Sequence, residues 1–180
     1  MVFVPRHFHL AKELELAEYN LHQNTGLDAG YTRFLSRAVA PVVCRFPGGE
    51  GLDFGSGPAP VLAQLLTAAG CSMSIFDKFY SPNPAPLAGE YDFVTATEVV
   101  EHLDAPGDTL GDLWQNVRSG GLLLIMTKRW LSLERFRQWH YKNDPTHIAY
   151  FHLNTFIYIA GRWRAQLLVL ADDLVLIRKR

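Results

Sequence analysis

The sequence predicts an α/β fold in which a mostly parallel sheet carries helices on both faces and ends in an antiparallel hairpin. Three observations predict it. Short apolar runs typical of buried strands alternate with amphipathic stretches of helical period. Glycine and proline clusters separate these segments. Near the C-terminus, two apolar runs flank Asp172-Asp173, which is the pattern of a hairpin that adds an antiparallel edge strand.

The elements follow one another in a regular order. Helices are expected over 12–19 and over 28–42, and Asp28 can cap the second. A strand over 51–54 leads through a glycine turn into a helix whose first turn holds Pro58 and which stops at Gly70. The remaining expected elements are strands over 71–76, 91–95, 122–126, 165–170 and 174–178, helices over 109–117 and 155–160, and a helical turn over 98–103.

Composition sets the broad class of the protein. The chain has 180 residues, 48% of them hydrophobic, which excludes a disordered chain. Its 17 basic and 18 acidic residues give a net charge of -1, so no global positive field favours nucleic acid or anionic lipid. Because no apolar run reaches the roughly 20 residues of a membrane span, and no secretory signal pattern is visible, we expect a soluble cytoplasmic protein. We expect one domain, 1–180, with an N-terminal lid segment over 1–27 and a core over 28–180.

A cofactor site is predicted where the first core strand meets its helix. Gly55, Ser56 and Gly57 form a turn that places no bulky side chain between backbone and ligand. Twenty residues beyond Gly57, Asp77 ends the second strand. A carboxylate there can accept both hydroxyl protons of a ribose. This arrangement favours a cofactor that contains adenosine.

The prolines of the turn distinguish between such cofactors. A dinucleotide site needs glycine or alanine where this chain has Pro60, and Pro58 removes one amide donor that a pyrophosphate would use. S-adenosylmethionine has no phosphates, and its sulfonium cation suits an acid such as Asp53 nearby. We therefore favour the methyl donor, with NAD(P) as the alternative cofactor.

Three segments carry a resemblance to a known superfamily. Residues 52–58 (LDFGSGP), 91–103 (YDFVTATEVVEHL) and 119–126 (SGGLLLIM) resemble three motifs of the class I S-adenosylmethionine-dependent methyltransferases, in the same order. The resemblance covers about residues 28–180 and implies a Rossmann-like fold and methylation of an acceptor. It differs in one place. Only about fourteen residues separate Asp77 from the next strand, so we expect the superfamily's third strand to be short or missing.

The resemblance also implies roles for individual residues. The backbone around Gly55, Ser56 and Gly57 would hold the methionine part of the donor, and Asp77 would hold the ribose. Lys78 and Phe79 would lie beside the adenine. Thr97 and Glu98 would border the methyl group.

A possible metal site follows the third core strand. Glu98, Glu101 and His102 share one face of a helical turn, and His147 comes later in the chain. The set is similar to the metal site of small-RNA 3′-terminal 2′-O-methyltransferases and of some ubiquinone-pathway O-methyltransferases. A divalent ion such as Mg²⁺ or Mn²⁺ is therefore one interpretation. Catalysis by Glu98 and by His102 as general base, without metal, is the second. A structural role for His102 is the third.

The acceptor is expected to be a small molecule methylated on oxygen or nitrogen. The mixed aromatic and polar loop 139–144 suits an acceptor wall, and Tyr19, His22 and Asn24 suit a lid over the cofactor. An RNA end is less favoured, because the basic cluster over 128–142 is modest in a nearly neutral chain. Two other functions stay open, namely an NAD(P)-binding oxidoreductase and a non-catalytic S-adenosylmethionine-binding module.

Overall fold

The computed structural model describes residues 1–21 and 28–180, and its centre is one six-stranded sheet. The first four strands of the sheet run parallel, whereas the last two form the expected antiparallel hairpin. The predicted Rossmann-like α/β class is therefore confirmed. In spatial order the strands are β3 (Ser72–Phe76), β2 (Glu50–Phe54), β4 (Tyr91–Thr97), β5 (Val117–Met126), β8 (Leu174–Arg178) and β7 (Gln166–Ala171).

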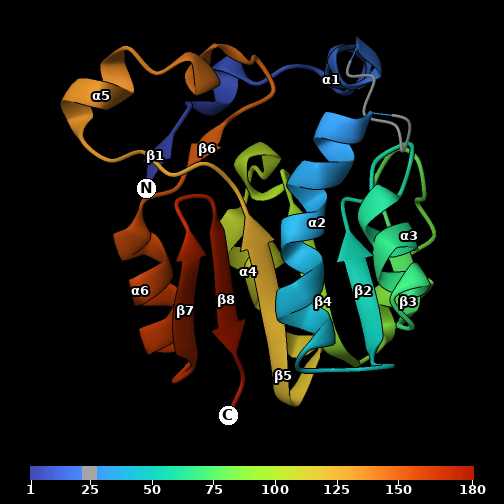
Figure 1. Ribbon diagram of the computed structural model, residues 1–180. Coiled ribbons are helices and arrows are strands. Elements are labelled where there is room, and N and C mark those ends of the chain that lie inside the picture. The colour runs from blue at the N-terminus through green and yellow to red at the C-terminus, as the bar shows by residue number, and fades with distance from the viewer. Residues whose placement is uncertain (22–27) are drawn as a thin grey trace.

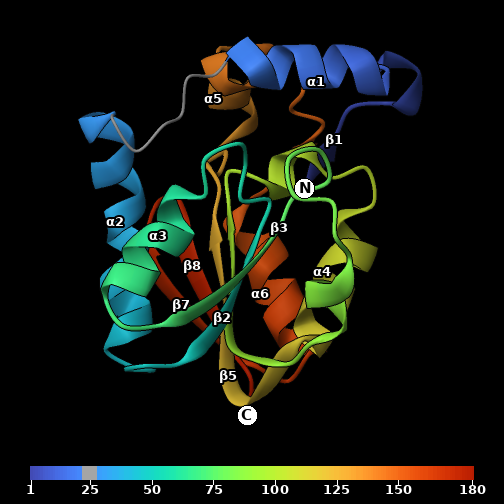
Figure 2. The same cartoon turned by 90° about the vertical axis from the view of Figure 1, so that its right-hand side faces the viewer.

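Helices cover both faces of the sheet, as Figures 1 and 2 show. On one face, α2 (Ala29–Val43) and α3 (Val61–Ala68) pack against apolar side chains of β4, β5 and β8. On the other face, α4 (Pro106–Gln115) and α6 (Leu153–Arg162) pack against a second apolar cluster. Both faces of the parallel strands are therefore buried, as is usual for parallel sheets. Within the described residues, no helix has the length and apolar character needed to cross a membrane.

The carboxyl ends of the parallel strands carry additional segments. Helix α1 (Lys12–Leu21) lies beyond these ends in both views (Figures 1 and 2). The connection after β5 contains α5 (Leu133–Arg137) and the 3-10 helix η4 (His140–Asn143). After η4, β6 (Ala149–Tyr150) pairs antiparallel with β1 (Val2–Phe3), which follows the start of the chain and precedes the 3-10 helix η1 (Arg6–Phe8). This pairing was not predicted, because two-residue strands leave no periodic pattern.

Two local expectations are confirmed. The Asp28 carboxylate accepts hydrogen bonds from the amides of Gly30 (2.7 Å) and Tyr31 (3.0 Å), so Asp28 caps α2. Residues 78–90, all of which are described, contain the 3-10 helix η2 (Ala85–Ala88) in place of a third strand and its helix. Strand β3 is therefore an edge of the sheet.

Two other expectations need correction. Helix α3 begins at Val61, after Pro58, because Pro60 disfavours helical geometry at the residue before it. The turn expected over 98–103 is a 3-10 helix, η3 (Val100–His102), so Glu98 lies outside it. Glu98 therefore does not share a helical face with Glu101 and His102, as the spacing had suggested.

Candidate active site

The glycine turn after β2 presents bare main chain. Gly55 and Gly57 have φ angles of 74° and 68°, which side chains rarely tolerate. A Cβ atom on Gly55 would lie 2.3 Å from the Val99 side chain, so only glycine fits there. The amide of Gly55 donates to the carbonyl of Phe76 (2.7 Å), and this bond fixes the turn against the end of β3.

Asp77 connects the glycine turn to the next loop. The Oδ2 atom of its buried carboxylate accepts from the Gly57 amide at 3.0 Å. Oδ1 accepts from the amides of Phe79 (2.8 Å) and Tyr80 (3.0 Å). Since a carboxylate oxygen can accept two hydrogen bonds, Oδ2 keeps capacity for a further donor, such as a ribose hydroxyl.

A cavity of about 390 Å³ opens at the carboxyl ends of β2, β3 and β4. That volume lies within the range of small-molecule sites. Two residues of the predicted site, Asp53 and Glu101, do not line it. The other predicted residues line it together: Gly55, Ser56, Gly57, Asp77, Lys78, Phe79, Thr97, Glu98, His102 and His147.

Asp53 is a buried residue of β2 that does not line the cavity. It is 2% exposed, and its Oδ1 atom accepts from the Thr95 hydroxyl at 2.7 Å. Burial raises the pKa of Asp53 to about 6, an effect that the Thr95 hydrogen bond opposes. Its geometry therefore points to a role in joining β2 to β4 and not to direct contact with a sulfonium.

Glu98 combines backbone strain with an unusual carboxyl environment. Its φ angle of 53° is rare for a residue with a side chain, and its amide donates to the carbonyl of Met126 (2.8 Å). Burial, followed by the nearby Glu101 carboxylate, raises the pKa of Glu98 to about 8. The Oε1 atom is buried without a hydrogen-bond partner. Strain and an unpaired polar atom together are typical of functional positions.

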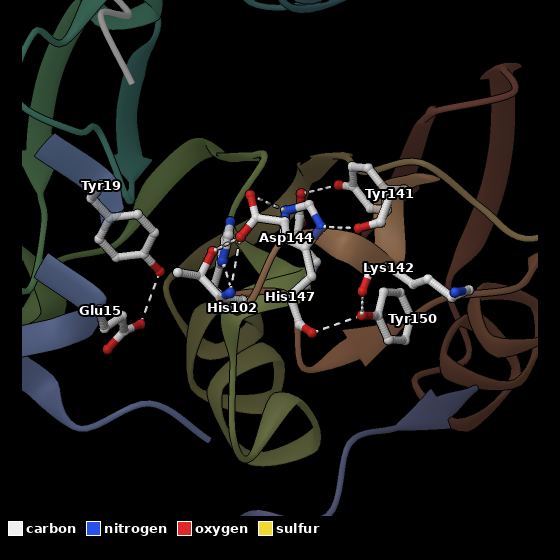
Figure 3. Close-up of polar contacts among 10 residues, drawn as sticks. Glu15, Tyr19, His102, Tyr141, Lys142, Asp144, His147 and Tyr150 are labelled. Atoms are coloured by element: carbon white, nitrogen blue, oxygen red, sulfur yellow. Dashed lines mark hydrogen bonds and ion pairs between the residues drawn. The ribbon is translucent and has the colours of Figure 1, made fainter. Parts of the chain in front are cut away.

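Glu101, His102 and His147 form a compact cluster, in which one ligand atom from each residue lies within 4.8 Å of the others. The Nδ1 atom of His102 lies 3.0 Å from the Thr146 carbonyl, and that of His147 lies 2.7 Å from the Tyr141 carbonyl (Figure 3). Because a carbonyl can only accept, both Nδ1 atoms carry hydrogen. Burial lowers the pKa of His102 to about 4 and also lowers that of His147. Both rings are thus neutral at pH 7, with a lone pair on Nε2.

Two side chains of this region were missed as individual site residues, although the loop 139–144 had been singled out. Tyr141 donates its hydroxyl hydrogen to Oε1 of the fully buried Glu101. Asp144 lines the cavity, and its Oδ2 atom lies 3.7 Å from Nε2 of His147. The mixture of aromatic and polar residues in the loop was the available signal, but it could not show which side chains turn inward.

Helix α1 covers one side of the cavity. The Tyr19 ring meets the ring of His102 edge-on, with centroids 5.2 Å apart, and lies 5.7 Å from that of Phe79. Glu15 forms an ion pair with Lys78 at 2.6 Å. The other two residues expected in the lid, His22 and Asn24, lie outside the described residues.

Comparison with known proteins gives the family. A family model described as "Methyltransferase domain" matches residues 16–162, which is most of the chain. The chain belongs to this methyltransferase family. The expected class I S-adenosylmethionine-dependent methyltransferase, an enzyme, is thereby confirmed, and the oxidoreductase alternative is set aside. No curated protein matches this methyltransferase.

Solved structures share the fold of the methyltransferase at low sequence identity. An Archaeoglobus fulgidus S-adenosylmethionine-dependent methyltransferase matches with a TM-score of 0.60 and 15% identity, over 82% of this chain and 94% of that one. Burkholderia thailandensis 1,6-didemethyltoxoflavin-N1-methyltransferase, solved with its acceptor and S-adenosylhomocysteine, gives 0.60 and 16%, over 93% and 86%. An O-methyltransferase family protein from the same organism gives 0.55 and 17%; the match covers 84% of this chain but only 57% of that one.

Proposed function

We propose that this methyltransferase moves the methyl group of S-adenosylmethionine to an oxygen or nitrogen atom of a small-molecule acceptor. One observation carries the proposal: a single cavity contains the bare glycine turn and Asp77 together with Glu98, His102 and His147. Groups suited to hold a donor and groups suited to accept a proton therefore line the same cavity.

The donor is proposed to lie along the carboxyl ends of β2 and β3. Its methionine part contacts the main chain of Gly55, Ser56 and Gly57, and its ribose contacts Oδ2 of Asp77. Its adenine lies beside Lys78 and the ring of Phe79. The methyl group then points toward Thr97 and Glu98, which line the same cavity.

Catalysis is proposed to come mainly from alignment of acceptor, methyl carbon and sulfur, because the sulfonium is already a good leaving group. The chain then needs only to remove a proton from the acceptor. In the absence of a metal, neutral His102, with its Nε2 lone pair, can accept that proton. The Glu98 carboxylate provides a second acceptor above its pKa of about 8.

A divalent metal fits the cluster beside the cavity. Glu101, His102 and His147 offer one carboxylate and two imidazoles, and both imidazoles are oriented by carbonyls as metal ligands usually are. A bound ion would lower the pKa of an acceptor hydroxyl. Two nitrogen ligands favour Mn²⁺ over Mg²⁺. The fourth expected ligand, Glu98, is not part of this compact set.

A small acceptor fits the surroundings better than an RNA end. The Lys78 ammonium, which lines the cavity, is neutralised by Glu15, so it offers little attraction to phosphate. Helix α1 also covers the cavity on the side of Tyr19. It belongs to the proposed lid segment 1–27, and residues 28–180 form the proposed core.

The test combines binding with turnover. Thermal-shift measurements should show stabilisation by S-adenosylhomocysteine and none by NAD or NADP. A panel of phenols, catechols, amines and RNA ends should then yield S-adenosylhomocysteine with at least one small molecule. Binding without any turnover would support a non-catalytic module, and turnover with RNA ends alone would contradict the proposed acceptor class. Turnover unchanged in chelator would reject the metal.

A further inference from the structure

We infer that Tyr141 is a positioning residue that sets Glu101 and His147 for metal binding and favours Oε2 of Glu101 as the single ligating oxygen. The inference rests on the metal site of the proposed function. It assigns a role to a residue that does not line the cavity, so Tyr141 acts through its two neighbours.

Tyr141 itself is held firmly in η4. Its side chain is buried, and its ring lies 4.8 Å from the ring of Trp139 and 4.1 Å from that of His147. The Lys128 ammonium lies 5.2 Å from the same ring. A ring packed on several sides keeps both its hydroxyl and the adjacent carbonyl in place.

The same residue contacts two of the three candidate ligands. Its hydroxyl donates to Oε1 of Glu101, and its carbonyl accepts from Nδ1 of His147 at 2.7 Å (Figure 3 shows Tyr141 and His147 facing each other). The carbonyl bond directs Nε2 of His147 toward the cluster. Tyr141 therefore orients two candidate ligands, Glu101 and His147, that are far apart in the sequence.

The hydroxyl bond has a second consequence for Glu101. Oε1 already accepts a hydrogen bond from Tyr141, whereas Oε2 is buried without a hydrogen-bond partner, so Oε2 is the oxygen with both lone pairs free for a metal. A carboxylate that ligates through one oxygen uses one position on the ion. Two imidazoles and one such carboxylate leave positions open for the oxygen atoms of an acceptor.

The test compares two matched tyrosine variants in the full chain. Tyr141→Phe removes the hydroxyl that touches Glu101. Tyr150→Phe removes the hydroxyl of another buried tyrosine, which donates to the His147 carbonyl at 2.8 Å and touches no ligand side chain. Free Mn²⁺ is measured by electron paramagnetic resonance, and S-adenosylhomocysteine binding by calorimetry.

We expect Tyr141→Phe to weaken Mn²⁺ binding by about 10-fold to 100-fold, with S-adenosylhomocysteine affinity unchanged, and Tyr150→Phe to leave both unchanged. Equal Mn²⁺ affinity in the two variants would overturn the inference, as would a wild-type chain that binds S-adenosylhomocysteine but no Mn²⁺. Absence of S-adenosylhomocysteine binding, with the Mn²⁺ difference intact, would overturn the proposed function alone.

A second measurement needs no variant and applies if Tyr141→Phe does not fold. X-ray absorption of the Mn²⁺-loaded wild-type protein should fit a carboxylate bound through one oxygen. Two Glu101 oxygens at the ion would overturn the inference.

Discussion

The two ends of the cavity are built in different ways. The proposed donor end, at the glycine turn and Asp77, depends mainly on main-chain groups: the Gly57 amide donates to the Asp77 carboxylate across a separation of 20 residues, between consecutive strands. At the proposed acceptor end, which contains Glu98 and the cluster of Glu101, His102 and His147, side chains from distant segments meet. Glu101 and Tyr141 are 40 residues apart, and His102 and Thr146 are 44 apart.

In the proposed function, donor binding and proton transfer therefore depend on different kinds of contact. Main-chain contacts can hold a donor tightly without unusual side chains, and they carry little strain outside the glycines. The acceptor end contains a strained Glu98 and buried carboxyl oxygens without partners, which lower stability but provide reactive groups. Substitutions at the donor end should therefore change affinity, whereas those at the acceptor end should change turnover.

The largest effect is expected for Glu101→Gln at the acceptor end. Glutamine keeps an oxygen that can accept from Tyr141 but removes the charge that would hold a metal. Loss of several kcal/mol of charge stabilisation lowers turnover on the order of 1,000-fold. The donor end is untouched, so S-adenosylhomocysteine affinity, measured by calorimetry, should stay within about two-fold. Equal losses of turnover and of S-adenosylhomocysteine affinity would contradict the proposed separation of donor binding from catalysis.

Gly55→Ala tests the donor end. The added Cβ would lie 2.3 Å from Val99 in a backbone with φ of 74°, so the turn must shift away from the donor. We expect S-adenosylhomocysteine affinity to fall about 100-fold, which corresponds to about 3 kcal/mol. Gly70→Ala is the matched control, because Gly70 has φ of 95°, open space and no place in the cavity. It should cost about 1 kcal/mol of stability and leave affinity unchanged.

Asp53→Asn tests a buried residue that belongs to neither end of the cavity. Burial raises the pKa of Asp53 from 3.8 to about 6. Between these values the unfolded chain releases a proton that the folded chain keeps, so the stability that the raised pKa contributes is present below about 4 and lost as pH approaches 6. Relative to wild type, Asp53→Asn should therefore gain up to about 3 kcal/mol over this interval. Urea unfolding of both proteins at pH 4, 5 and 6 measures the gain. The same pH dependence of the free energy of unfolding in both proteins would contradict it.

The smallest effect is expected for Glu15→Gln, which removes the ion pair between α1 and Lys78. Because exposed pairs contribute no more than about 1 kcal/mol, S-adenosylhomocysteine should dissociate only a few-fold faster, as stopped-flow measurements can show. Glu50→Gln is the control, since Glu50 pairs with Arg118 at 2.6 Å and does not line the cavity. An equal change in the dissociation rate of both variants would contradict the proposed role of α1 as a lid.

The sequence predicted the donor end well because its information is local. The run LDFGSGP and the position of Asp77 predicted a strand, a turn and a carboxylate in register, and all appear. The predicted start of α3 was wrong. Pro60 disfavours helical geometry at the residue before it, and this effect outweighs the usual preference for proline, here Pro58, in a first helical turn. Asp53 was placed near the ligand because strand alternation alone does not show which face the cavity occupies.

The acceptor end was predicted only in part. The residue types of the cluster were visible in the chain, but the local backbone was not. A 3-10 helix in place of an α-helical turn separated Glu98 from Glu101, and a positive φ at a glutamate has no sequence signature. Tyr141 was hidden because its role depends on where a long loop returns to η3, and such long-range closure cannot be inferred from spacing.

The pairing of β1 with β6 has a consequence for motion. The Val4 amide donates to the carbonyl of Ile148 (2.9 Å), whose own amide donates to the carbonyl of Glu101 (2.8 Å). The segment around Val4 is thus connected by two successive backbone hydrogen bonds, through Ile148, to the main chain of Glu101 in η3. Local opening of the N-terminal strand and loosening of η3 should be thermodynamically linked, so that amide hydrogen exchange speeds up in both when either is disturbed.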